Sequence, residues 1–162
     1  MKVLLTLSLT CILFACSSIK KSKHVKVLQA TETVIYPGVA GSPTTHHIVV
    51  KAEMKKTGKL QCDTFWSNGY ADRARVFNSS MQDATGKEVK KGETVVFGFY
   101  YFVSPDSDDS ENMYPHAGSG SEKAEPARTH NGGLLFRYKI DDSQYYYLSV
   151  SDIIKGEPVF GE

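Results

Sequence analysis

Apolar and polar residues alternate with a period of two over much of the chain, and this period is typical of half-buried β-strands. No stretch shows the period of an amphipathic helix, and turn pairs such as Pro37-Gly38 and Asn68-Gly69 separate the alternating segments. The pattern predicts strands over residues 27–35, 47–55, 59–66, 70–78, 87–89, 94–103, 134–141 and 145–151. We therefore expect an all-β fold.

Two neighbouring predicted strands carry apolar faces that match. The first face consists of Ile48, Val50, Ala52 and Met54, and the second of Leu60, Cys62, Thr64 and Trp66. If the strands form a hairpin, directly opposed residues must share a face. A three-residue loop, 56–58, meets this condition with Gly58 in the left-handed conformation. The predicted register places Met54 opposite Leu60, Ala52 opposite Cys62 and Ile48 opposite Trp66.

The segment VVFGFYYFV, residues 95–103, is apolar on both faces, which predicts a central strand covered on each side. The preceding KKGET resembles the turn before a core strand in bacterial immunoglobulin-like domains. About eight short strands favour an antiparallel two-sheet β-sandwich of this immunoglobulin-like kind over a barrel. Residues 104–133 interrupt the pattern with a long polar loop, whose composition favours disorder.

The first residues have a different pattern. Thirteen mostly apolar residues, Val3 to Ala15, are too few to cross a bilayer and have the length of a signal-peptide core. They end in Leu13-Phe14-Ala15-Cys16, which resembles the lipobox of bacterial lipoproteins. The resemblance implies lipid attachment to the Cys16 thiol and cleavage before it, with several acyl chains anchoring the protein stably. Ser17 after the cysteine implies the outer membrane of a Gram-negative envelope.

Composition limits the partners and the covalent support of the mature chain. Cleavage before Cys16 leaves 147 residues with 18 basic and 18 acidic side chains, and this neutrality argues against nucleic acid as a partner. Only Cys16 and Cys62 remain, so we expect no intramolecular disulfide. The expected organisation is a signal peptide over 1–15, a lipidated tether over 16–30 and one β-sandwich domain over 31–162.

Few residues suggest catalysis. The pair His46-His47 could serve as a base for Cys62, but the predicted register places His47 on the opposite face and far along the strand, so a thiol–imidazole pair is not expected and Cys62 is interpreted as a small buried hydrophobic residue. His116 and His130 of the long loop, together with at most one of His46 and His47, are candidate metal ligands, but we expect no metal and no other cofactor. The acidic run Asp106, Asp108, Asp109 and Glu111 lacks the glycine and glutamate of an EF-hand loop.

The last predicted hairpin offers the clearest candidate binding surface. If its apolar residues face inward, Arg137, Lys139, Tyr145 and Tyr147 face outward, where aromatic rings beside cations suit protein contacts or stacking on sugars. The alternative is that these side chains only pair with one another across the two strands and shield the sheet from solvent. We expect a non-catalytic binding or structural module that contacts another envelope component. The alternatives are a carbohydrate-binding module and a hydrolase or metal-assisted enzyme whose site is completed by residues 104–133.

Overall fold

The computed structural model describes residues 22–104, 122–123 and 133–161, and within them the chain forms only strands, turns and loops. The strands are β1 (Val25–Tyr36), β2 (Thr44–Met54), β3 (Gly58–Ser67), β4 (Tyr70–Arg73), β5 (Arg75–Asn78), β6 (Glu88–Val89), β7 (Thr94–Val103), β8 (Glu122–Lys123), β9 (Leu134–Ile140), β10 (Tyr146–Val150), β11 (Ile154–Lys155) and β12 (Val159–Phe160).

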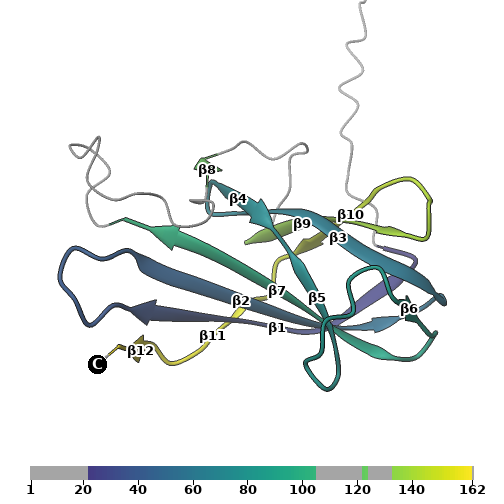
Figure 1. Cartoon of the computed structure of the whole chain (residues 1–162), viewed down its shortest axis with the longest axis horizontal. Coiled ribbons are helices and arrows are strands. Elements are labelled where there is room, and N and C mark those ends of the chain that lie inside the picture. Colours follow the sequence, from purple (N-terminus) through teal and green to yellow (C-terminus); the bar gives the residue numbers. More distant parts are fainter. Residues whose placement is uncertain (1–21, 105–121, 124–132, 162) are drawn as a thin grey trace, which may run out of the picture.

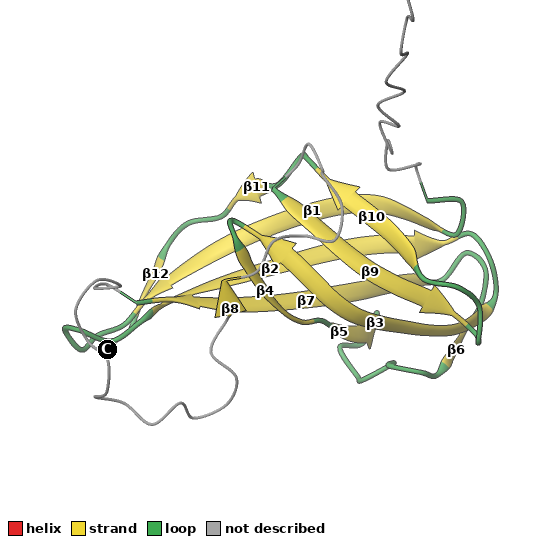
Figure 2. Ribbon diagram, turned by 90° about the horizontal axis from the view of Figure 1, so that it is seen from above, coloured by secondary structure: helices red, strands yellow, loops and turns green. Residues whose placement is uncertain are grey.

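The strands form two sheets that pack face to face (Figures 1 and 2). The first sheet has the order β11-β1-β2-β7-β5, with β12 also on β1, and the second has the order β10-β9-β3-β4-β8, with β6 on β3. Without the two-residue strands the orders are β1-β2-β7-β5 and β10-β9-β3-β4, which correspond to strands A-B-E-D and G-F-C-C′ of immunoglobulin-type sandwiches. The predicted all-β, antiparallel two-sheet sandwich is confirmed.

Aromatic side chains fill the centre of the space between the sheets. The Phe136 ring lies 4.8 Å from the Phe97 ring and 5.2 Å from the Phe99 ring, centroid to centroid, and Phe65 lies 5.1 Å from Phe99. All four rings are fully buried, and burial of each stabilises the fold by about 1.5–3 kcal/mol. Aromatic packing rather than a disulfide thus fills the centre of this sandwich, whereas antibody domains have a buried tryptophan against an inter-sheet disulfide.

The predicted hairpin between the second and third strands is wrong, although one predicted face is correct. Strand β2 pairs with β1 and β7, whereas β3 pairs with β9, β4 and β6 in the other sheet. Residues Ile48, Val50, Ala52 and Met54 do share the buried face. Gly58 begins β3 and is not in the left-handed conformation; a Cβ there would overlap Ile140 Cγ2, so glycine serves close packing between strands.

A β-bulge in β3 explains why Trp66 does not face the core. The register with β9 shifts between Cys62 and Phe65, so that Phe65 pairs with Phe136 and Trp66 with Leu135. An extra residue reverses the faces of every residue that follows it. Phe65 therefore joins Leu60 and Cys62 in the core, and Trp66 lies on the outer face of the second sheet.

Three further features of the strands differ from the prediction. Residues 70–78 form two strands in different sheets, β4 and β5, rather than one. Strand β7 is central, as predicted, but its outer face is not covered throughout, since Tyr100 is 39% and Phe102 40% exposed. Strand β1 begins at Val25, two residues before the predicted start at 27 and within the range expected for the tether, and Val25 and Ala30 are buried.

Short strands that the periodicity did not predict complete the sheets. Strand β8, within the expected polar loop, pairs with β4, and β11 and β12 pair in parallel with β1. Two residues are too few to show any alternation. The C-terminal segment thus lies along the edge of the first sheet, as Figure 2 shows.

Candidate functional site

The four residues predicted as a binding surface lie together on the outer side of the last hairpin. Strands β9 and β10 pair with Tyr147 opposite Arg137 and Leu148 opposite Phe136, so the hydrophobic residues face inward as expected. Tyr145 directly precedes β10 and is 47% exposed. The Arg137 guanidinium lies 4.5 Å from the centroid of the Tyr145 ring, and Lys139 Nζ lies 5.9 Å from it.

Two residues that the sequence did not assign to this surface hold it in place. Asp63, in the bulged part of β3, forms an ion pair with Arg137. Trp66 lies nearly parallel to Tyr147 with ring centroids 6.4 Å apart, and it is only 7% exposed. We call Asp63, Trp66, Arg137, Lys139, Tyr145 and Tyr147 the Tyr145 surface. The β-bulge in β3 brings Asp63 and Trp66 to the Tyr145 surface, and no pattern in the sequence predicts that bulge.

Partial burial disfavours the charged form of Arg137, yet the pKa of this guanidinium is raised. The opposing influences are its hydrogen bonds and charge interactions with Asp63 and Tyr147. Arg137 is therefore a permanent cation in a fixed position over an exposed tyrosine ring. Such a cation–π pair is worth about 0.5–1 kcal/mol at an exposed site and keeps both side chains in one geometry.

A second polar group, which the sequence reading missed, lies between the sheets at the end of the sandwich farthest from Val25. Glu32, on the inner face of β1, is only 2% exposed. His46 Nδ1 lies 2.8 Å from its Oε1, the Tyr101 hydroxyl donates to Oε1 at 3.2 Å, and Lys155 Nζ donates to Oε2. Asn68 Nδ2 donates to the Tyr101 oxygen at 2.6 Å. We call these five residues the Glu32 cluster.

The Glu32 cluster is electrostatically satisfied. Burial by itself would raise the pKa of the Glu32 carboxyl, but hydrogen bonds from Lys155 and His46 and their charges outweigh it, so the pKa is lowered. Burial, together with the Glu32 charge, raises the pKa of Tyr101 to about 12. Glu32 is thus ionised and Tyr101 neutral near pH 7. Because the cluster joins both sheets and the C-terminal segment, we interpret it as a set of polar contacts that stabilises their packing.

Cys62 and the adjacent histidines do not form a catalytic pair. The Cys62 thiol donates to the Arg137 carbonyl at 3.3 Å, and burial raises its pKa, which opposes formation of a thiolate. His46 belongs to the Glu32 cluster. His47 lies on the outer face of the first sheet, where its ring stacks on that of Tyr100 with the centroids 4.1 Å apart. Cys62 is a buried hydrophobic residue, as predicted.

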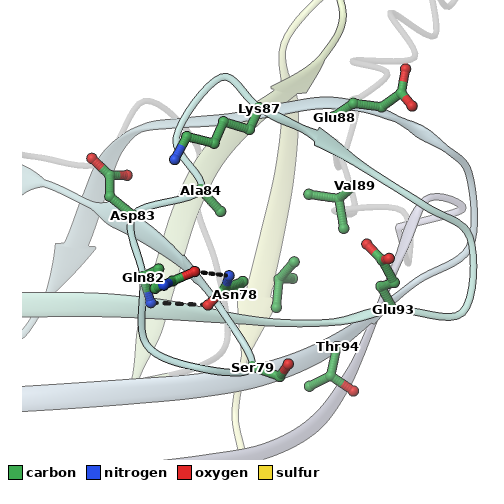
Figure 3. A pocket seen from close by; sticks show the side chains of 11 residues that line it. Asn78, Ser79, Gln82, Asp83, Ala84, Lys87, Glu88, Val89, Glu93 and Thr94 are labelled. Atoms are coloured by element: carbon green, nitrogen blue, oxygen red, sulfur yellow. Dashed lines mark hydrogen bonds between the residues drawn. The ribbon is translucent and has the colours of Figure 1, made fainter.

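A hollow of about 560 Å³ lies at the turns that flank β6 (Figure 3). Asn78 and Gln82 on its wall bind each other, through Asn78 Nδ2 to Gln82 Oε1 at 3.1 Å and Gln82 N to Asn78 Oδ1 at 2.9 Å. Charges of both signs, including Lys87 and Glu93, surround it. Small-molecule sites are usually lined by apolar groups with a few convergent polar ones, so this lining does not indicate a ligand.

Several predicted residues lie outside the described residues: Cys16, the acidic run 106–111, His116 and His130. Within the described ranges, no three His, Cys, Asp or Glu side chains gather as metal ligands. The same part of the chain contains no helix long and apolar enough to cross a membrane.

The fold and the Tyr145 surface together define a two-sheet β-sandwich with one organised aromatic and cationic patch. Comparisons with protein-family models, curated proteins and solved structures give no match for this chain. Function must therefore be inferred from these residues.

Proposed function

We propose that this chain is a lipid-anchored protein of the bacterial envelope whose β-sandwich binds or supports another envelope component without catalysis. The supporting observation is that Arg137 is fixed between Asp63 and the ring of an exposed tyrosine, Tyr145. Side chains that are already ordered lose little conformational entropy on binding, and tyrosine and arginine are enriched among the residues that dominate binding energy.

The chemistry of the surface favours a protein partner over a glycan. A sugar-binding platform needs open aromatic faces, whereas Arg137 lies over one face of Tyr145 and Trp66 is almost fully buried. Asp63, Arg137 and Lys139 instead present both signs of charge beside an aromatic ring, which suits the mixed contacts of a protein interface. An enzymatic role has no comparable support among the described residues.

In-cell photo-cross-linking tests this role. A photoreactive phenylalanine analogue replaces Tyr145 in one variant and Tyr100 in a matched control, since both tyrosines are partly exposed, and Tyr145 precedes β10 of the second sheet whereas Tyr100 lies on β7 of the first. We expect a discrete cross-linked protein at position 145 and none at position 100. In the same experiment Arg137→Ala reduces the cross-linked product about tenfold or more. Equal products at both positions, or none at 145, would contradict the proposed surface.

The anchor is tested separately. Cys16→Ser removes the proposed lipid-bearing thiol, and Cys62→Ser is the matched control because Cys62 is a buried free thiol of the domain. We expect Cys62→Ser to keep the mass increment of the acyl chains and to fractionate with the outer membrane, and Cys16→Ser to lose both. Retention of the added mass by Cys16→Ser rules out the proposed attachment.

A further inference from the structure

Three segments meet at the end of the sandwich where the described chain begins: residues 22–24, the turn 55–57 and the turn 90–93. Lys55 N donates to the His24 carbonyl at 2.7 Å, Gly92 N to the Met54 carbonyl at 2.8 Å, and Lys91 N to Thr57 Oγ1 at 3.0 Å. These bonds join the segments into one rigid surface. In Figure 1 it lies at the end opposite the C-terminus.

This surface is rich in lysine. We call Lys23, Lys55, Lys56, Lys90 and Lys91 the basic end. Lys55 pairs with Glu53 at 2.6 Å, and Glu93 accepts a bond from the backbone N–H of Lys90. Asp141 and Asp142 are the acidic residues on the neighbouring turn, and Asp141 likewise accepts from a backbone N–H, that of Lys59.

The positive charges act together at this end. Burial is the main cause that lowers the pKa of His24, and the charges of Lys56 and Lys23 lower it further. At the other end of the sandwich, loops 37–43 and 68–69 carry no charged side chain. Five lysines and four carboxylates therefore gather at the end where the chain leaves the domain toward Cys16, whereas these two loops are uncharged.

The length of chain between Cys16 and the basic end limits how far this end can lie from a lipid surface. Ser22 follows Cys16 by six positions along the chain. Even fully extended, six residues span about 20–22 Å. The potential of an anionic bilayer decays over a Debye length of about 8 Å at physiological ionic strength, so the lysines are confined to within a few Debye lengths of the head groups.

We propose that the basic end docks on anionic phospholipid head groups and sets the orientation of the domain on the bilayer. This inference rests on the lipid anchor of the proposed function, which supplies the confinement. The long axis of the sandwich then stands away from the membrane, with the uncharged loops and the Glu32 cluster at the distal end. Each lysine at such a surface increases partitioning about fivefold.

Lysine footprinting on the reconstituted lipoprotein tests the docking. The acylated protein is placed in vesicles of phosphatidylcholine alone or of phosphatidylcholine and phosphatidylglycerol in equal amounts, then labelled with a membrane-impermeant acetylating reagent and analysed by mass spectrometry. We expect Lys56, Lys90 and Lys91 to react several-fold more slowly on the anionic vesicles. Lys51, exposed on the outer face of the first sheet, serves as the internal reference and keeps the same rate.

A pair of variants and a salt titration complete the test. Lys56→Gln/Lys91→Gln abolishes the protection of Lys90, whereas the matched control Lys51→Gln/Arg75→Gln retains it, and raised salt removes it in the wild type. Equal labelling on both kinds of vesicle overturns the docking. Failure of the protein to float with phosphatidylcholine vesicles overturns the anchor instead, so the two failures are distinguishable.

Discussion

At the scale of single residues, the position of Glu32 is the least expected feature of the chain. It occupies an inward position of β1 that alternation assigns to an apolar side chain, and its carboxylate is ionised there because His46, Tyr101 and Lys155 surround it. A carboxylate on the apolar side of a strand was visible in the sequence as an exception to the pattern. Its partners were not, because they come from β2, β7 and β11, far apart along the chain.

Tyr101→Phe tests the stabilising role of the Glu32 cluster by removing only the hydroxyl that bridges Asn68 and Glu32. We expect a loss of about 1–2 kcal/mol in the free energy of unfolding, because a hydrogen bond to a buried charge is broken. Tyr100→Phe is the matched control, since the neighbouring ring is exposed and its stacking on His47 does not need the hydroxyl. Urea denaturation of both variants measures the difference, and equal midpoints would refute the role of the cluster.

The ionisation of Glu32 predicts how stability changes with acid. Its pKa is lower in the folded protein than its ordinary value of 4.5, so its stabilisation is fully present above pH 4.5 and is lost as the pH falls through the folded pKa. We expect Glu32→Gln to be less stable than wild type at pH 7 and to lose less stability on acidification. The control Glu88→Gln, at an exposed site on β6, should keep the slope of the wild type in urea titrations at each pH.

At the scale of elements, alternation predicts which residues face inward but not which strands pair. The face Ile48-Val50-Ala52-Met54 is correct because burial on one side is a local property of a strand. The short 55–57 connection suggested a hairpin, yet it carries the chain from one sheet to the other. The split at Ala74 between β4 and β5 has neither proline nor glycine to mark it. The shared outer face of Arg137, Lys139, Tyr145 and Tyr147 could be predicted because β9 and β10 are regular, whereas Asp63 and Trp66 were missed because of the bulge.

The C-terminal segment is held to the first sheet by few contacts. Residues 154–161 are exposed, and β11 and β12 join β1 through two residue pairs each. Lys155→Gln weakens the attachment to Glu32, so the amides of Gly156 and Gly161, bonded to Glu32 O at 2.7 Å and Tyr36 O at 2.9 Å, should exchange faster with deuterium. The control Lys51→Gln should leave them unchanged. Unaltered exchange in Lys155→Gln would show that backbone pairing alone holds the segment.

At the scale of the whole molecule, the basic end and the turn before Tyr145 lie at the same end of the sandwich, from which the chain leaves toward the proposed anchor. Tyr145 follows the turn 141–144, at the end from which the chain leaves toward Cys16, so a partner reached through it must itself lie close to the bilayer. Periodicity predicted the sandwich and this hairpin, but the end at which each loop lies depends on strand direction and sheet order.

Lengthening the tether tests this arrangement. Insertion of about 20 glycine and serine residues between Ser18 and Ser22 allows the domain to move tens of ångströms from the membrane. We expect cross-linking through position 145 to fall several-fold while the acyl chains and the thermal midpoint stay unchanged. An insertion of the same composition after Glu162 is the control. Undiminished cross-linking with the long tether would place the partner away from the membrane.

Cys62 is the one cysteine among the described residues. It is buried in the core, and its thiol donates a hydrogen bond to the Arg137 carbonyl. The aromatic packing of Phe65, Phe97, Phe99 and Phe136 stabilises the sandwich without any covalent link between its sheets. Folding of the described domain therefore does not depend on a disulfide. Its melting temperature is expected to be unchanged by dithiothreitol, and the same fold should form under reducing and under oxidising conditions.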